Sequence, residues 1–153
     1  MAGMTTDVTR TPAARPIRAV CAFDAAGKPE PQGSARAFVR AGQARITSDN
    51  PNLHGWREVV GWSARAAMGG SPLADRPGEV YLHLTFRLAR PRSAPKSRVH
   101  PTTKPDLDKL LRACLDGMSG VVYRDDAQVV GCRVNKRYCE PGEQPGVNVE
   151  VWG

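Results

Sequence analysis

The 153-residue sequence lacks the features that mark several large classes of protein. It has no apolar run near the roughly 18 residues of a membrane-spanning helix, and its first residues contain no signal-peptide-like apolar stretch. Its four cysteines form no Cys-x-x-Cys pair, so neither a disulfide framework nor a common zinc site is expected. Extracellular, collagen-like, coiled-coil and membrane-spanning proteins are therefore excluded, and we expect a cytoplasmic protein with reduced thiols and no membrane contact.

The sequence also lacks the short motifs of many enzymes and has few acidic residues. No glycine-rich phosphate loop, dinucleotide fingerprint or Ser-His-Asp arrangement is present. The 15 Asp and Glu residues are outnumbered by 22 Lys and Arg residues, which gives a net charge of +7, and 17 of the 22 are arginines. Because the planar guanidinium suits phosphate better than a lysine does, this excess favours a polyanionic partner such as nucleic acid.

Hydrophobic periodicity predicts the secondary structure. The clearest strand is 80–88, where apolar and polar residues alternate strictly and give the strand one buried face. From Leu107 to Met118, apolar residues recur at the spacing of an amphipathic helix. The order of elements predicts an α+β fold, with a mixed sheet and two main helices in a single domain over 17–153, after a flexible tail over 1–16. The predicted elements are a strand over 17–24, a hairpin over 37–47, a helix over 53–68, a strand over 80–88, a helix over 106–118, and strands over 129–138 and 147–151.

A basic loop runs directly into a cluster of acids. Six basic residues and no carboxylate lie between Arg87 and Lys104, in a segment that three prolines keep from forming a helix. A basic run of this kind can be a solvated surface. Here, however, five of the 15 acids follow within 106–126, and metal-dependent phosphodiester chemistry requires such a neighbourhood of cations and carboxylates. The candidate DNA-binding residues are Arg90, Arg92, Lys96, Arg98, Lys104 and Lys109.

Asp106 and Asp108 are the first candidate ligands of Mg²⁺, which prefers hard oxygen ligands. They straddle the start of the predicted helix, where a non-helical Asp106 allows both side chains to converge. The alternative is structural: Asp106 caps the helix, and Asp108 is a first-turn charge favoured by the helix dipole.

Asp125 and Asp126 provide the third candidate carboxylate. The helix over 106–118 is about 20 Å long, and an extended segment over 119–125 would span about 23 Å, enough to return to the helix start. Successive side chains of an extended segment point in opposite directions, so only one of the two acids should face the cluster. Asp116 lies about 12 Å along the helix from Asp108 and is predicted to be an exposed charge outside the site.

Arg112 is one helical turn past Asp108 on the same face. It either pairs with Asp108 on the surface or stabilises the transition-state charge at a scissile phosphate. Among the remaining candidates, Trp56 is assigned to the core, Trp62 to a possible dimer contact, and only His100 is placed within reach of DNA.

Two segments together resemble a known family. Lys104-Pro-Asp-Leu-Asp-Lys-Leu-Leu-Arg-Ala-Cys-Leu-Asp-Gly117 and Val121-Val-Tyr-Arg-Asp-Asp-Ala-Gln-Val129 resemble the RusA-type Holliday-junction resolvases of bacteria and their phages. The upstream Pro29-Glu-Pro-Gln-Gly-Ser34 with Arg36 resembles the Pro-rich loop of that family. The resemblance covers roughly residues 17–151.

This resemblance implies a RusA-like fold and a homodimeric, Mg²⁺-dependent endonuclease. Such an enzyme nicks opposed strands of four-way DNA junctions in recombination and repair, in a bacterial or phage-encoded setting. The catalytic acids of the family map to Asp106, Asp108 and Asp126, which would also hold the metal. Lys109 stands where the family usually has asparagine, and Arg112, a candidate catalytic residue, stands where the family has a lysine on this helix.

Two other functions remain as alternatives. One is a non-catalytic basic DNA-binding protein whose carboxylates are helix caps and solubilising charges. The other is a nuclease for flaps or other branched DNA. Divalent-metal dependence separates the first alternative from a nuclease, because a pure binding protein cuts nothing.

Overall fold

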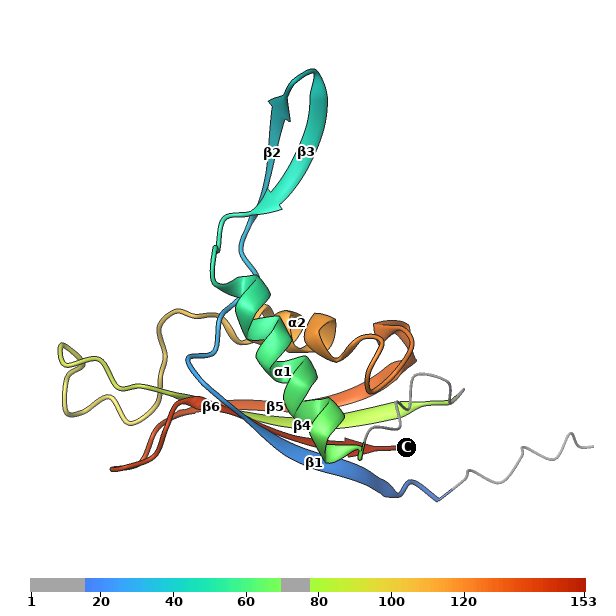
Figure 1. The fold of residues 1–153 in the computed structure, drawn as a ribbon. Helices are drawn as coiled ribbons and strands as arrows, with labels where there is room; N and C mark the ends of the chain where they lie inside the picture. Colours follow the sequence, from blue (N-terminus) through green and yellow to red (C-terminus); the bar gives the residue numbers. More distant parts are fainter. Residues whose placement is uncertain (1–15, 70–77) are drawn as a thin grey trace, which may run out of the picture.

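The computed structural model describes residues 16–69 and 78–153, which form a mixed four-stranded sheet, a separate hairpin and two helices (Figure 1). The sheet has the strand order β1-β6-β4-β5. The predicted α+β fold with a mixed sheet and two main helices is confirmed. The expected tail over 1–16 lies outside the described residues except for its last member. The elements are β1 (Ala19–Ala26), β2 (Ala35–Arg40), β3 (Gln43–Ser48), α1 (Leu53–Ala67), β4 (Val80–Leu88), α2 (Leu107–Met118), the 3-10 helix η2 (Asp126–Gln128), β5 (Val129–Tyr138) and β6 (Gly146–Trp152).

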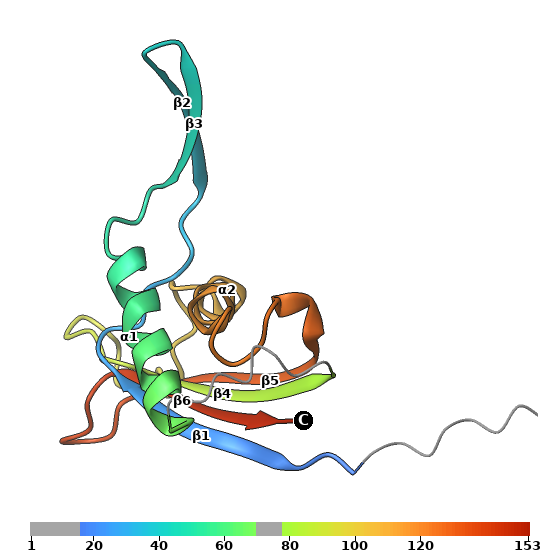
Figure 2. The same cartoon turned by 45° about the vertical axis from the view of Figure 1, so that its right-hand side comes forward.

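The core lies between the sheet and the two helices, which cover the same face of the sheet (Figures 1 and 2). The alternation along β4 gives the sheet an apolar face for the helices to cover. The side chains of this face lie in the core: Leu82, Leu84, Phe86 and Leu88. Trp56 of α1 is buried with them, as predicted. Cys114 of α2 is also in the core, where burial raises the pKa of its thiol to about 12, and all four cysteines are free thiols. Within the described residues, no helix is long and apolar enough to span a membrane.

The pairing of β4 with β5 is parallel, whereas β6 is antiparallel to both β1 and β4. A parallel pair cannot be joined by a hairpin and needs a crossover connection. Here the crossover runs from Leu88 to Val129 and contains the basic loop over 89–104, helix α2 and η2. All the predicted catalytic acids therefore lie on one connection over one face of the sheet.

Helices α1 and α2 approach each other closely at two glycines. A Cβ atom on Gly117 would lie 2.9 Å from the carbonyl oxygen of Arg57, and one on Gly61 would lie 3.0 Å from the carbonyl oxygen of Gly117. Next to this contact, the Arg57 guanidinium donates to the Asp116 carboxylate. The prediction that Asp116 is merely an exposed charge is therefore wrong: its side chain is only 29% exposed and connects the two helices.

The close contact predicts opposite effects for two glycine-to-alanine changes. Gly117→Ala should lower the free energy of unfolding by about 1–3 kcal/mol, because the added methyl group overpacks the helix contact. Gly55→Ala, in α1 with no atom within 4 Å of its Cβ position, should raise it by up to about 1 kcal/mol through helix propensity. Urea unfolding of both variants measures the difference. Equal stabilisation by both changes would contradict the close approach.

Candidate active site

The carboxylate of Asp106 does not cap helix α2, although Asp106 occupies the N-cap position. Its backbone is extended, with φ −72° and ψ 142°, and its carbonyl oxygen accepts the first helical hydrogen bond from the amide of Leu110 at 3.1 Å. The side chain makes no capping hydrogen bond. The carboxylate is half-exposed, and the Nζ of Lys109 lies 3.5 Å from its Oδ2. The structural alternative for Asp106, a side-chain cap, is therefore wrong.

Two contacts hold the start of α2 in place. The Nζ of Lys136, on β5, donates to the carbonyl oxygens of Thr103 at 3.0 Å and Pro105 at 2.8 Å. From the other side, the backbone amide of Gln32 donates to the carbonyl oxygen of Lys109 at 2.9 Å. The sheet and the proline-rich loop thus fix the backbone on both sides of Asp106.

Asp106 borders a pocket of about 600 Å³. Three parts of the chain form its wall: the proline-rich loop over 28–34, the base of the β2–β3 hairpin, and the two ends of the basic loop. Glu30 in this wall is only 8% exposed, and its carboxylate accepts a hydrogen bond from the Nδ2 of Asn50 at 3.0 Å. Three lysines also border the pocket, so its charge is mixed: Lys28, which lies 3.6 Å from the Glu30 carboxylate, Lys104, and Lys109 beside Asp106.

Asp108 and Arg112 lie on the exposed surface of α2 and do not pair with each other. Both residues are exposed, and no ion pair or hydrogen bond joins their side chains in the part of the chain that the structure describes. The expected surface pair is therefore absent. Both side chains remain available to a ligand that approaches the start of α2.

Asp125 and Asp126 differ in what their side chains do. The Asp125 carboxylate accepts a hydrogen bond from the amide of Ala127 at 2.8 Å and forms a capping box with Gln128 at the start of η2. Asp126, in the first turn of η2, makes no such cap and is half-buried. Asp125 is therefore engaged as a cap of η2, whereas Asp126 is not.

The expected extended return to the start of α2 is wrong. After α2 the chain turns sharply, because the amides of Val121 and Val122 both donate to the carbonyl oxygen of Met118. The hydroxyl of Tyr123 then donates to the carbonyl oxygen of Leu115 at 2.7 Å. Burial raises the pKa of Tyr123, and the nearby Asp126 carboxylate adds to this rise. Asp126 therefore lies near Tyr123, whose hydroxyl contacts the second half of α2.

The three predicted acids consequently do not form one cluster. Across residues 16–69 and 78–153, no three His, Cys, Asp or Glu side chains are grouped so that they could hold a metal ion. Asp106 and Asp108 nevertheless suit Mg²⁺, which commonly binds one or two carboxylates and completes its octahedron with water and substrate phosphate. The donor set at the start of α2 fits a cation of this type without the third acid.

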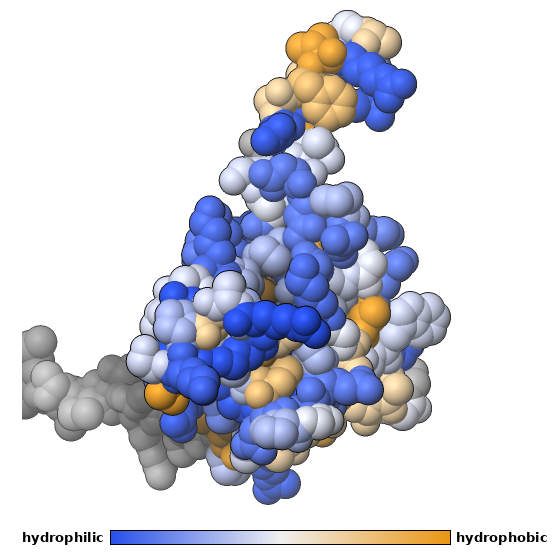
Figure 3. All heavy atoms as spheres, turned by 90° about the vertical axis from the view of Figure 1, so that its left-hand side faces the viewer, coloured by the Kyte–Doolittle hydropathy of each residue, from blue (hydrophilic) through white to orange (hydrophobic). Residues whose placement is uncertain are grey.

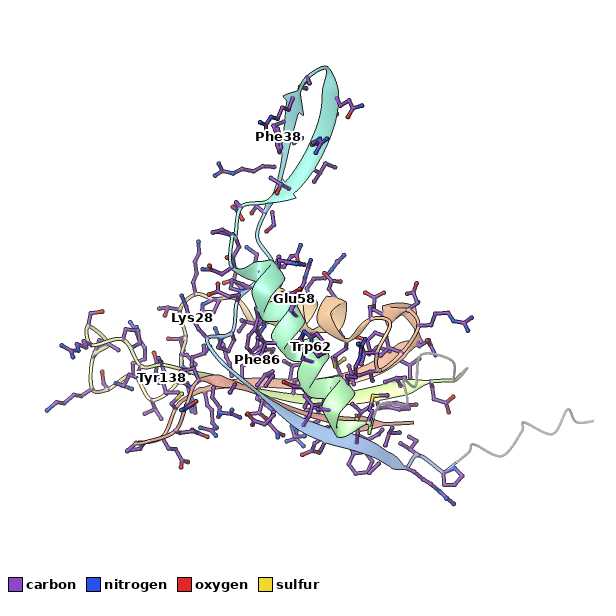
Figure 4. All side chains as sticks on the ribbon, viewed as in Figure 1. Lys28, Phe38, Glu58, Trp62, Phe86 and Tyr138 are labelled. Atoms are coloured by element: carbon purple, nitrogen blue, oxygen red, sulfur yellow. The ribbon has the colours of Figure 1, made fainter. Side chains whose placement is uncertain are left out.

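The basic loop over 89–104 is folded around one of its own arginines. The Arg90 guanidinium donates to the carbonyl oxygens of Arg98 at 2.8 Å and Pro95 at 2.7 Å, and it stacks 5.0 Å from the ring centre of Tyr138, at the base of the loop (Figure 4). Arg90 therefore stabilises the folded shape of the loop and is also a candidate DNA contact. Arg92 and Lys96 are exposed. The side of the molecule seen in Figure 3 is predominantly hydrophilic.

Arg87 does not belong to this open basic surface. Its guanidinium is buried and binds the two carboxylate oxygens of Asp24 at 2.6 and 2.7 Å, and its Nε donates to the carbonyl oxygen of Gln144 at 3.2 Å. The interpretation of Arg87 as the first member of the basic arm is wrong. The regular alternation of β4, which continues to Leu88, already indicated that Arg87 lies within the sheet.

Sequence reasoning missed several residues that shape the site. Glu30 was part of a recognised motif, but nothing in the sequence indicated that the start of α2 packs beside it. Lys136 lies 30 residues after Asp106 in the sequence. Its contact with the carbonyl oxygen of Pro105 depends on the parallel pairing of β5 with β4, which the sequence does not reveal. Asn50 carries no sequence signal for the site, yet its side-chain amide donates to the Glu30 carboxylate and to the carbonyl oxygen of Pro31.

A known family and a known protein each match most of this chain. The family described as "Endodeoxyribonuclease RusA" matches residues 27–152, which include every element from the proline-rich loop to β6. The protein YqaN of Bacillus subtilis (strain 168), described as uncharacterized, is 28% identical over 139 residues, which cover 84% of this chain and 93% of that relative. The match spans the basic loop, the uncapped Asp106 and the acids along α2 and η2, and the chain belongs to the RusA endodeoxyribonuclease family.

Proposed function

We propose that the protein is a Mg²⁺-dependent endonuclease that resolves four-way DNA junctions by paired nicks in opposed strands. The observation that carries the proposal is the Asp106 carboxylate, which is held at the N-cap position of α2 without capping it. A cap would explain this residue without any function. Because the Asp106 side chain makes no capping hydrogen bond, Asp106 and Asp108 provide a pair of hard oxygen ligands. They lie next to the basic loop, where a phosphate backbone can approach.

The residues on the exposed surface of α2 have different roles in the proposed reaction. Asp106 and Asp108 hold the cation, which when bound activates water and neutralises charge that develops on the phosphate. Arg112, one turn further along, donates to the scissile phosphate. Asp126 is the third acid assigned to the reaction, and it would accept a hydrogen bond from a second water near the phosphate.

The remaining basic residues bind the DNA without taking part in the chemistry. Arg92, Lys96 and Arg98 contact backbone phosphates, and Lys104 and Lys109 contact the phosphates nearest the cation. Arg90 holds the loop in shape and adds its charge. A homodimer suits this substrate, because a two-fold enzyme on a near two-fold junction places one active site on each of two opposed strands.

The proposal is tested with a synthetic four-way junction and a linear duplex of the same sequence, each incubated with Mg²⁺ or with EDTA. Paired nicks in the junction with Mg²⁺, none in EDTA and little cleavage of the duplex are the expected results. Binding with no cleavage under any metal condition would identify a non-catalytic DNA-binding protein. Preferred cleavage of a flap substrate would replace junction resolution with another branched-DNA activity.

Asp108→Asn is predicted to abolish cleavage while junction binding persists or becomes tighter. The change removes a cation ligand and also a negative charge that repels the phosphate backbone. Glu58→Gln, which neutralises an exposed acid on α1, is the matched control and should cleave at the parent rate. If Asp108→Asn loses its fold along with its activity, the residue is structural.

Arg112→Lys is predicted to retain most of the activity, because lysine also places a cation at the phosphate. Arg112→Ala should lower the rate by about a hundredfold, the scale for removing one donor to a transition-state oxygen. Single-turnover cleavage at saturating enzyme separates this chemical effect from binding. An alanine variant as fast as the parent would show that Arg112 does not contact the reacting phosphate.

Replacing Arg92, Lys96 and Arg98 together with glutamine should weaken the salt dependence of junction binding. The slope of log K against log salt should fall by about 2.7, because each phosphate that the protein no longer neutralises lowers it by about 0.9. A second triple variant, Arg18, Arg65 and Arg133 to glutamine, removes the same charge from other parts of the surface and should change the slope little. Equal effects of the two variants would mean that the loop acts only through net charge.

A further inference from the structure

The β2–β3 hairpin projects away from the body of the protein as an isolated arm (Figures 1 and 2). Its two strands pair only with each other among the described strands. Each strand has six residues and spans about 20 Å. A lone two-stranded hairpin is at best marginally stable in water, so an arm of this kind is best explained by a ligand that it binds.

The register of the hairpin gives it two different faces. Residues paired directly across an antiparallel hairpin share a face, and alternate pairs point to opposite sides. The pairs Arg36–Thr47, Phe38–Arg45 and Arg40–Gln43 share one face, which therefore carries all three arginines of the arm. Ala37–Ile46 and Val39–Ala44 form the opposite, apolar face.

The arginine face is strongly positive and is not neutralised by the protein. Residues 35–48 contain three arginines and no acid. No ion pair involves Arg36, Arg40 or Arg45 within the described chain, and all three are exposed. Phe38, on the same face, is 42% exposed (Figure 4).

The base of the arm is part of the wall of the pocket beside Asp106. Gly33, Ser34, Asp49 and Asn50 border that pocket, and the amide of Asp49 donates to the carbonyl oxygen of Ser34 at 3.3 Å. A Cβ atom on Gly33 would lie 3.0 Å from the backbone nitrogen of Asn50, so a side chain at this position would press against the other end of the arm. The arm therefore begins at the candidate active site.

We propose that the β2–β3 hairpin is a DNA-binding arm that lays its arginine face along the phosphate backbone leading away from the cleavage site. The inference rests on the proposed function for the identity of the ligand, but it concerns a surface outside the catalytic residues. Arg45 pairs with Phe38, midway between Arg36 and Arg40, so the arginines follow one another about 7 Å apart. Measured along the axis of a DNA duplex, that spacing corresponds to about two nucleotides of one strand at about 3.4 Å each, and a two-stranded ribbon fits the major groove.

The test is the binding of a four-way junction in EDTA at several salt concentrations. Replacing Arg36, Arg40 and Arg45 with glutamine should weaken binding and reduce the slope of log K against log salt by about 2.7. The control is the triple variant of Arg18, Arg65 and Arg133 to glutamine, which removes the same charge elsewhere. Circular dichroism should match the parent, because the arginine side chains are exposed. An unchanged slope, or equal slopes for the two variants, would overturn the proposal.

A second variant separates DNA binding from contact between copies of the chain. Val39→Thr with Ile46→Thr changes the apolar face, whose two side chains are 74% and 77% exposed, and should leave the salt slope unchanged. If this variant loses both the dimer and DNA binding while the arginine variant binds normally, the arm joins two copies and the proposal is wrong. Because no cleavage is measured, failure of the arm and failure of the proposed nuclease are distinguishable.

Discussion

The parallel pairing of β4 with β5 is the constraint on which the candidate site depends. Parallel strands require a crossover, and this crossover carries the basic loop, α2 and η2 across one face of the sheet. Lys136 on β5 then binds the carbonyl oxygens of Thr103 and Pro105, which ties the crossover to the strand below it. The start of α2 is therefore held by the sheet, and Asp106 is presented on rigid backbone.

The electrostatics of the site follow from that placement. The basic loop and the lysines of the pocket surround carboxylates that make no capping contact at the helix start. Cations nearby attract a polyanion, whereas the carboxylates of Asp106 and Asp108 repel it unless a divalent cation lies between them and the phosphate. On the function proposed above, this surface would attract DNA and would couple productive binding to a metal.

Much of the fold could be predicted because its signals are local. The alternation of β4 and the apolar stripe of α2 predict the first and last residues of these two elements to within one residue. The position of Asp126 could not be predicted in this way, because turn hydrogen bonds to Met118 and the Tyr123 contact with Leu115 keep the chain near the end of α2. Arg87 and Arg90 were likewise counted as open charges, although tertiary contacts with Asp24 and with loop carbonyl oxygens engage both. The two faces of the hairpin could be assigned only from the residue pairing between β2 and β3 in the structure.

The location of the bound cation provides the most direct test of the proposed site. Paramagnetic Mn²⁺, used in place of Mg²⁺, broadens the NMR signals of amides close to its site. We expect broadening centred on the amides of residues 106–109, lost in the Asp106→Asn, Asp108→Asn double variant and retained in Asp126→Asn. Broadening centred on residues 125–128, or unaffected by the double variant, would contradict the assignment of the cation to Asp106 and Asp108.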